Sequence, residues 1–268
     1  MSLEEGGSVE VRVEQRLKQF QLTTAATQMG PRLCQAGHAK ALSVIGEVLD
    51  LEAEVRQQRR IARLRSAAQL PPGKTWETFD ATHLPVALQQ RLVELRRGEF
   101  LDRAVNVLSF GLPGVGKSHA ACALGQAMVE QGHSVLFRPA YQLVQELLAA
   151  KRDFTLPRLL HKLDAFELLI VDDIGYVKQS PEEAEVLFTL ISERYERRSL
   201  LVTSNLMFSE WERIFKDAMA TAAAIDRLVH HAIILEFTGA SYRTSEAGRD
   251  SPSRSPAGKR SRGTPRSS

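Results

Sequence analysis

The chain of 268 residues lacks the features that mark secreted, fibrous or membrane-spanning proteins. Its two cysteines, Cys34 and Cys122, have the spacing of neither a metal site nor a disulfide framework. No uncharged apolar run approaches the roughly 20 residues that a membrane-spanning helix needs. The acidic N-terminus also lacks the apolar core of a signal peptide. We therefore expect a cytoplasmic protein with reduced cysteines and no membrane contact.

The charge is unevenly distributed, although the net charge is only +3. Segment 241–268 holds seven basic and two acidic residues, so it carries +5 and the rest of the chain carries −2. The body is therefore not globally basic, and any contact with nucleic acid would have to use local patches. Segment 244–268 is rich in Ser, Pro, Gly and Arg and has almost no large apolar residues, which predicts a disordered basic tail.

Two further regions precede this tail. Residues 1–70 have apolar positions at helical spacing, which predicts a helical N-terminal module in which Gly30-Pro31 separates two shorter helices. Pro71-Pro72-Gly73 ends that pattern. From 71 to 243, short apolar runs alternate with amphipathic segments, which predicts an α/β domain with a parallel sheet flanked by helices. The predicted strands are 105–110, 134–137, 168–171, 200–203 and 233–237.

A glycine-rich loop follows the first predicted strand directly and leads into a helix-forming run that begins at His119. The loop consists of Gly111, Leu112, Pro113, Gly114, Val115, Gly116, Lys117 and Ser118, and we expect these residues and His119 to bind the nucleotide. Its glycines allow backbone N–H groups to surround phosphates, and we expect Lys117 to reach the β- and γ-phosphates of ATP and Ser118 to bind Mg²⁺. This order of strand, loop and helix predicts a P-loop NTPase rather than a glycine-rich turn with a surface lysine.

Polar side chains end two more of the predicted strands. Asp172 and Asp173 follow the strand at 168–171, and we expect Asp172 to hold Mg²⁺ and Asp173 to orient and polarise the attacking water. Asn205 follows the strand at 200–203. In a doubly wound sheet it would lie between the two catalytic strands, near the γ-phosphate. The alternatives are ordinary strand caps and a turn asparagine, since asparagine favours turns on its own account.

Arginines cluster near the end of the helical module. Arg56, Arg59, Arg60 and Arg63 have the i, i+3, i+4, i+7 spacing of one helix face. Such a face suits the phosphates of double-stranded DNA, with binding that depends on salt and little on sequence. An equally good interpretation is a solvated face that pairs with the acidic segment 47–54.

These motifs resemble the IstB subgroup of the AAA+ ATPases, which are helper proteins of insertion-sequence transposases and relatives of the helicase loader DnaC. The resemblance covers about residues 54–243 and includes the P-loop with its flanks. Its other diagnostic stretches are Asp172-Asp-Ile-Gly-Tyr176, Ser192-Glu-Arg-Tyr195, Thr203-Ser-Asn-Leu206, Phe208-Ser-Glu-Trp211 and Asp226-Arg-Leu-Val-His-His231.

The resemblance implies an ATPase that uses ATP and Mg²⁺, assembles as an oligomer on DNA and assists a transposase through its N-terminal helices. Asn205 looks like the sensor-1 residue, and Arg243 occupies a sensor-2-like position. Arg227 is similar to the arginine finger that completes a neighbouring subunit's site; the alternative is a surface arginine on an amphipathic helix. Asp173 is one methylene shorter than the glutamate of many AAA+ proteins, a departure that concerns the hydrolysis rate more than nucleotide binding.

Other functions would require only some of these motifs. A DnaC-like helicase loader shares the core and differs in what the N-terminal helices bind. A P-loop kinase acting on a small molecule would not need Asn205 or Arg227, and a non-hydrolysing ATP-switched binding module would not need Asp173. His230 and His231 have no carboxylate or cysteine beside them in the sequence, so we interpret them as helix-end residues rather than metal ligands.

Overall fold

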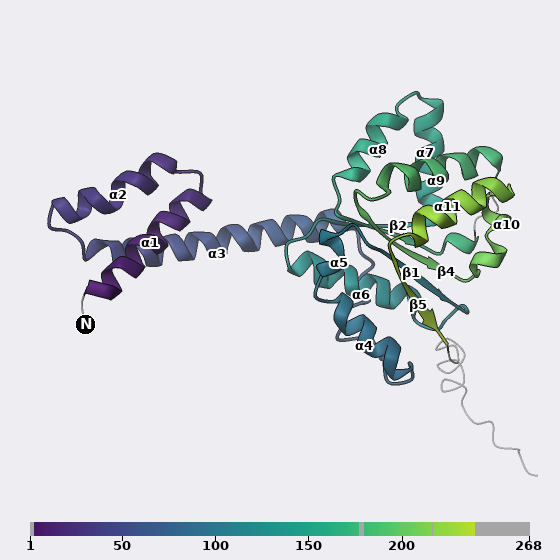
Figure 1. Ribbon diagram of the computed structural model, residues 1–268, viewed down its shortest axis with the longest axis horizontal. Helices are drawn as coiled ribbons and strands as arrows, with labels where there is room; N and C mark the ends of the chain where they lie inside the picture. The colour runs from purple at the N-terminus through teal and green to yellow at the C-terminus, as the bar shows by residue number, and fades with distance from the viewer. Residues whose placement is uncertain (1–2, 177–179, 216, 239–268) are drawn as a thin grey trace, which may run out of the picture.

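The computed structural model describes residues 3–176, 180–215 and 217–238. Its N-terminal part consists of α1 (Leu3–Gln19), α2 (Thr23–Gln35) and the long helix α3 (Ala41–Ala68). Figure 1 shows α1 and α2 packed beside the first half of α3, apart from the rest of the chain, while the other end of α3 reaches the sheet. A small core joins the three helices; its buried members are Val13, Leu17, Ala26 and Leu42.

The expectation that Gly30-Pro31 separates two helices is wrong, because both residues lie inside α2. Gly30 is buried against α1, and a Cβ at this position would overlap the carboxylate of Glu10. Glycine therefore allows the two helices to pack closely, and this packing favours a continuous α2 despite the hydrogen bond that Pro31 cannot donate. The chain instead turns between α1 and α2, where Gln21 adopts a φ of 61°.

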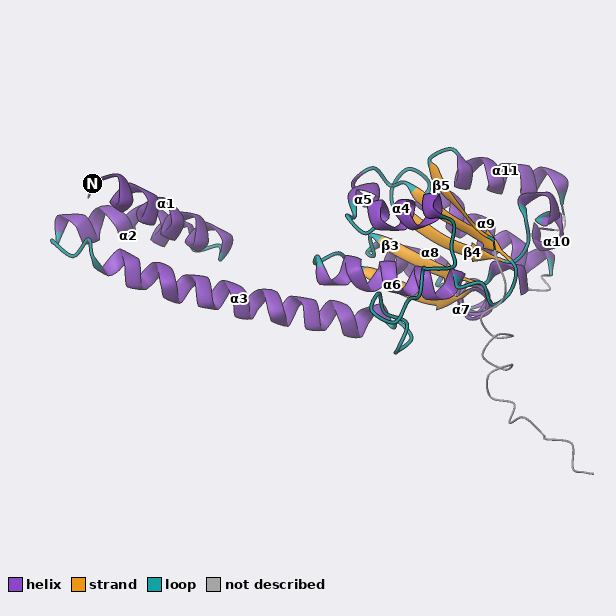
Figure 2. Cartoon of the chain, turned by 90° about the horizontal axis from the view of Figure 1, so that it is seen from below, coloured by secondary structure: helices purple, strands orange, loops and turns teal. Residues whose placement is uncertain are grey.

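A five-stranded parallel sheet forms the centre of the second part (Figure 2). The strands are β1 (Asn106–Gly111), β2 (Val135–Pro139), β3 (Leu168–Asp172), β4 (Ser199–Ser204) and β5 (Ala232–Phe237). Their order in the sheet is β2-β3-β4-β1-β5. The predicted α/β fold and all five predicted strands are confirmed. Because β4 lies between β1 and β3, the residues that follow these three parallel strands lie close together at the carboxyl ends of the strands.

Helices cover both faces of the sheet, and alternate strand residues point to each face. Val107 and Ile170 pack on one side, while Leu108 and Val171 pack on the other. The first side is covered by the end of α3 with α4 (Val86–Leu95), α5 (Glu99–Asp102) and α6 (Lys117–Glu130). The second side is covered by α7 (Ala140–Arg152), α8 (Leu156–Asp164), α9 (Pro181–Arg194), α10 (Glu212–Phe215) and α11 (Ala218–Val229). None of the described helices is both long and apolar enough to cross a membrane.

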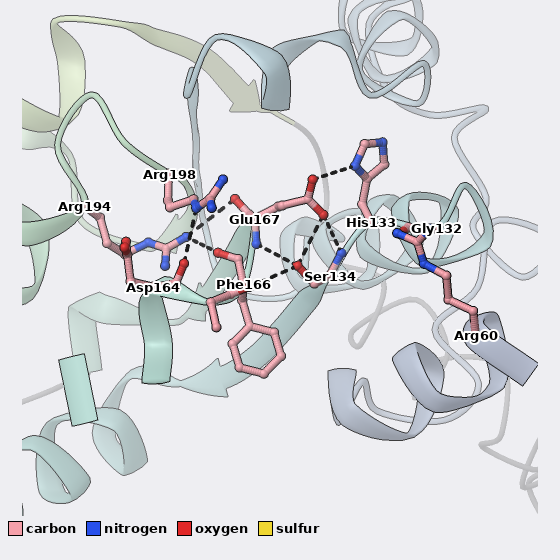
Figure 3. Close-up of polar contacts among 10 residues, drawn as sticks. Arg60, Gly132, His133, Ser134, Asp164, Phe166, Glu167, Arg194 and Arg198 are labelled. Carbon is pink, nitrogen blue, oxygen red and sulfur yellow. Dashed lines mark hydrogen bonds and ion pairs between the residues drawn. The ribbon is translucent and has the colours of Figure 1, made fainter. Parts of the chain in front are cut away.

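A buried arginine ties together the elements at the amino ends of the strands (Figure 3). Arg194 is 1% exposed, and its guanidinium donates hydrogen bonds to the carbonyls of Leu163 at 2.8 Å, Phe166 at 2.9 Å and Ser199 at 3.0 Å. These carbonyls belong to α8, to the turn before β3 and to the start of β4. Burial lowers the pKa of Arg194 to about 10, so the side chain stays charged at neutral pH.

Candidate nucleotide-binding site

The loop between β1 and α6 has the backbone conformation of an anion cradle. Gly114 and Gly116 have φ values of 86° and 98°, in the left-handed region where a side chain is strained. Gly116 is the N-cap of α6, so the loop leads directly to the positive end of a helix dipole. Val115, which is 2% exposed, anchors the loop in the core below α6. Leu112 and Pro113 face solvent on the outer side.

The first two residues of α6 place an amine and a hydroxyl at this cradle. Lys117 is 7% exposed, and its Nζ donates hydrogen bonds to the carbonyls of Gly111 at 2.7 Å and Leu112 at 2.8 Å. The buried ammonium group is therefore held inside the loop, where phosphate oxygens can replace these carbonyls. The half-buried hydroxyl of Ser118 makes no hydrogen bond within the described part of the chain, which leaves it available to a ligand.

Two aspartates stand at the carboxyl end of β3, and Thr203 of β4 bridges them. The hydroxyl of Thr203 donates to Oδ1 of Asp172 at 2.7 Å and accepts from the backbone N–H of Asp173 at 2.8 Å. Asp173 has a φ of 67°, a conformation that costs a non-glycine residue on the order of 1–3 kcal/mol. Thr203 thus orients one carboxylate and helps hold the strained backbone of the other.

Asn205 follows β4 and lies between the loop after β1 and the aspartates after β3. Its Oδ1 is buried and has no hydrogen-bond partner within the described chain. A Cβ on Gly175 would overlap this oxygen, so the glycine makes room for the Asn205 side chain. An unpaired buried oxygen costs about 1–3 kcal/mol, which a hydrogen bond from a water molecule at this position would offset.

His119 connects the start of α6 to the segment before α4. Its Nε2 lies 3.1 Å from the carbonyl oxygen of Thr75 and 3.1 Å from Oγ1 of Thr78. Its ring packs against Phe79 with a centroid separation of 5.2 Å. The imidazole is thus engaged by residues 75–79. The contribution of His119 to nucleotide binding that we predicted would therefore be indirect, through the position of this segment.

Arg227 lies near the opposite end of the sheet, where the strands begin. Its neighbour Leu228 accepts a hydrogen bond at 3.1 Å from Nδ2 of Asn106, the first residue of β1. The P-loop begins at Gly111, the last residue of β1, and at about 3.3 Å per residue the strand is about 17 Å long. The Arg227 guanidinium donates to the carbonyl of Ala223 at 3.0 Å and lies 5.0 Å from the ring centroid of Phe188. The structure therefore does not bring Arg227 to the P-loop of its own chain.

Comparison with known families identifies the chain. The family described as IstB-like ATP binding protein matches residues 14–249. The chain belongs to this family. An insertion-sequence ATP-binding protein of Sinorhizobium fredii is 46% identical over 210 residues, which cover 78% of this chain and 70% of the relative. The IS21 protein of the same description from Pseudomonas aeruginosa is 41% identical over 198 residues, covering 74% of this chain and 75% of the relative. ATP binding, the property named for these relatives, agrees with the geometry of the loop.

Solved structures support the fold of this IstB-like protein. The crystal structure of DnaI has a TM-score of 0.53 and 18% identity, covering 65% of this chain and 94% of that one. AMPPCP-bound DnaA from Aquifex aeolicus has a TM-score of 0.51 and 18% identity, covering 63% of this chain and 51% of that one. At these identities the likeness concerns the fold alone. The AAA+ fold class expected from the sequence is confirmed.

The four arginines predicted to bind DNA line one open groove of about 800 Å³ beside α3, but their side chains differ in what they contact. Arg56 pairs with Glu52 at 2.6 Å and lies over the ring of Phe20. Arg60 donates to the carbonyl of Gly132 at 3.0 Å (Figure 3). Arg59 and Arg63 are exposed and make no hydrogen bond or ion pair with the described residues. Arg243 lies outside the residues that the structure describes.

Three residues that organise the sheet of this IstB-like protein and its site had no individual role in the sequence analysis. Thr203 bridges the aspartates, Gly175 admits Asn205, and Arg194 ties the amino ends of β3 and β4. All three belong to stretches that support the family resemblance, and a polar residue near the end of a buried strand is a further usable signal for the threonine. The glycine lies in the short 3-10 helix after β3, and nothing local indicates its role, because the side chain that it accommodates is distant in the sequence.

Proposed function

We propose that this IstB-like protein hydrolyses ATP with Mg²⁺ in an oligomer that assembles on DNA, and that its nucleotide state controls its assistance to an insertion-sequence transposase. The separation of Arg227 from the P-loop supports this proposal most directly. The two features lie at opposite edges of one sheet, about 17 Å apart along β1. If the side of one chain where the strands begin were placed against the side of the next chain where the strands end, Arg227 would lie near the neighbour's γ-phosphate.

The residues at the carboxyl edge fit a nucleotide with a divalent ion. Ser118 offers a hydroxyl that has no hydrogen-bond partner among the described residues, and Asp172 offers a carboxylate that Thr203 holds in place. Both are hard oxygen donors, which Mg²⁺ prefers. Bound there, the ion would neutralise charge on the phosphate oxygens. Asp173 would take the role of orienting and polarising water, and Asn205 would direct a polar group at the same position.

An arginine from the adjacent chain would make hydrolysis depend on assembly. Charge spreads over the γ-phosphoryl oxygens in the transition state, and an arginine supplied in trans is worth about 10³–10⁵ in rate where it has been measured. Arg227 suits this role because its guanidinium is held by one carbonyl and one aromatic face, and neither contact neutralises its charge.

Subunit mixing tests this arrangement. We expect Lys117→Ala and Arg227→Ala to be nearly inactive alone, since one lacks the phosphate contact and the other lacks the finger. In an equal mixture, about one quarter of the head-to-tail interfaces would combine an intact Lys117 with an intact Arg227, so activity should return to about that fraction of the wild type. ATP hydrolysis would be measured with and without double-stranded DNA, alongside the size of the assembly.

Other outcomes of this experiment would favour other functions. If Arg227→Ala alone hydrolyses ATP at the wild-type rate without DNA or assembly, the trans-arginine model is wrong and a P-loop kinase becomes the better interpretation. If wild-type turnover is undetectable and Asp173→Asn changes nothing, the protein is an ATP-switched binding module.

An exposed apolar stripe on α3 supports the assignment of residues 1–70 to partner binding. Val44, Val48, Leu51 and Val55 recur at i, i+4, i+7 and i+11 and are 61%, 58%, 61% and 38% exposed. Such a continuous stripe on an otherwise solvated helix is typical of a surface that another helix covers. We assign the stripe to an insertion-sequence transposase.

Pull-down with the full chain tests this partner. Val48→Glu with Leu51→Glu should abolish capture of the transposase, whereas Gln58→Glu, at an exposed polar position farther along the same helix, should not. Capture of a replicative helicase instead, lost in the same double variant, would establish the DnaC-like loader as the function.

A further inference from the structure

Two turns at the amino edge of the sheet bring two imidazoles and a carboxylate together. Glu196 lies in the turn between α9 and β4, and His230 and His231 form the turn between α11 and β5. Nδ1 of His230 is 3.6 Å and Nε2 of His231 is 3.8 Å from Oε1 of Glu196. The carboxylate that the sequence does not show beside these histidines is thus supplied by a residue more than thirty positions earlier, and the interpretation of them as helix-end residues alone is incomplete.

The spacing of these three atoms suits a transition-metal ion. All three lie within 4.8 Å of one another. In a tetrahedral zinc site with bonds of about 2.0–2.1 Å, the ligand atoms are about 3.3–3.4 Å apart. The observed separations from Glu196 exceed this value by a few tenths of an ångström. Rotation of three exposed side chains can close such a gap without moving the backbone.

The backbone that carries these ligands is held rigidly by Asn106. This residue is 7% exposed. Its Nδ2 donates to the carbonyl of Leu228 at 3.1 Å, its Oδ1 accepts from the N–H of Leu200 at 2.9 Å, and its own N–H donates to the carbonyl of His231 at 2.8 Å. One buried residue therefore joins the end of α11 to the start of β4, and so fixes both turns relative to each other. A metal site is strongest when its ligands are preorganised in this way.

Tyr195 lies against the same cluster. Its hydroxyl is 2.8 Å from Nδ1 of His230, so an ion bound at this nitrogen would displace the hydroxyl. The exposed side chains leave room for this exchange. His230 and His231 also line an open pocket of about 580 Å³, which gives an ion a path of entry and room for water.

We propose that Glu196, His230 and His231 form a binding site for a divalent metal ion such as Zn²⁺. Two neutral imidazoles and one carboxylate are the ligand set of open zinc sites, in which water occupies the fourth position. The ion would join the turn after α9 to the turn after α11. It would thereby restrain the last turn of the helix that carries Arg227. The proposal requires neither ATP hydrolysis nor assembly, so it stands or fails independently of the proposed function.

Metal titration of the full chain tests the site. The protein would carry no histidine tag, would be stripped of metal with a chelator, and would contain Cys34→Ser because that thiol is exposed. Zn²⁺ binding would be measured by calorimetry, and Co²⁺ binding by visible absorption, which distinguishes tetrahedral from octahedral ligands. We expect one ion per chain, displacement of Co²⁺ by Zn²⁺, and a rise in the thermal midpoint with Zn²⁺.

Matched variants distinguish this site from adventitious surface binding. Glu196→Gln, His230→Ala and His231→Ala should each weaken Zn²⁺ binding at least tenfold and remove the rise in thermal midpoint. His161→Ala, an exposed histidine on α8, should behave like the parent. Glu196→Gln changes an exposed side chain by one atom, so its result does not depend on altered folding. Absence of stoichiometric binding to the parent, or equal affinity in Glu196→Gln, His230→Ala and His161→Ala, would overturn the proposal.

Discussion

Replacing Thr203 with valine would remove one hydroxyl from the centre of the candidate catalytic site while preserving its shape. Thr203 is 1% exposed, so water cannot take the place of the lost group. The substitution removes the donor to Asp172 at 2.7 Å and the acceptor of the Asp173 N–H at 2.8 Å. It touches neither the P-loop nor the exposed surface.

The expected magnitude follows from these two hydrogen bonds. A bond to an ionised group contributes about 1.5–3 kcal/mol, and a buried N–H without a partner costs about 1–3 kcal/mol. The free energy of unfolding should therefore fall by about 2–4 kcal/mol. If about 2–3 kcal/mol of the loss also affects the transition state, ATP hydrolysis slows by about 30- to 150-fold, since each 1.36 kcal/mol is a factor of ten.

Steady-state ATP hydrolysis, nucleotide affinity and urea unfolding would be measured for Thr203→Val and Thr203→Ser. Serine keeps the hydroxyl and loses only a methyl group, so it should retain most of the activity. Nucleotide affinity should change little in either variant, because the phosphate contacts of the P-loop are intact. Wild-type turnover in Thr203→Val would refute the role of this hydroxyl in orienting the aspartates. Equal losses in both variants would refute it as well.

Three further variants test other parts of the structure. Gly175→Ala should displace Asn205, because a Cβ overlaps its Oδ1, and should lower the turnover number at least tenfold with little change in ATP affinity. Arg194→Lys keeps the charge but leaves buried carbonyls without donors, so urea unfolding should show a loss of about 2–4 kcal/mol. Arg59→Gln combined with Arg63→Gln should weaken binding to double-stranded DNA equally across sequences. The slope of the logarithm of the binding constant against the logarithm of the salt concentration, measured by fluorescence anisotropy, should fall in magnitude by about 2. An unchanged slope would mean that neither side chain contacts phosphate.

Local patterns were sufficient to predict the sheet. Each strand is a short apolar run with helical segments on both sides, and the observed strand ends differ from the predicted ones by at most two residues. The position of β4 between β1 and β3 was also predictable, because doubly wound parallel sheets have few orders. Asn205 and the two aspartates therefore lie near one another as a direct consequence of the topology.

Contacts between distant parts of the chain were not predictable in the same way. Gly30-Pro31 is a strong local signal for a helix end, yet close packing of Gly30 against Glu10 favours a continuous α2. The spacing of Arg56 and Arg60 places them on one face, but each side chain finds a partner that the spacing does not reveal, Phe20 in one case and Gly132 in the other.

Asn106 shows how one buried side chain can organise an edge of the sheet that sequence patterns leave undefined. In the sequence it is only the polar first residue of an apolar strand. In the structure it joins the end of α11 to the start of β4, and so sets the position of Arg227 and of the Glu196–His230–His231 cluster together. Because β1 has Asn106 at one end and the P-loop at the other, a rigid strand connects the nucleotide to the surface proposed to face the next subunit. A change in the loop that shifts β1 along its axis would therefore move both features of that surface at once.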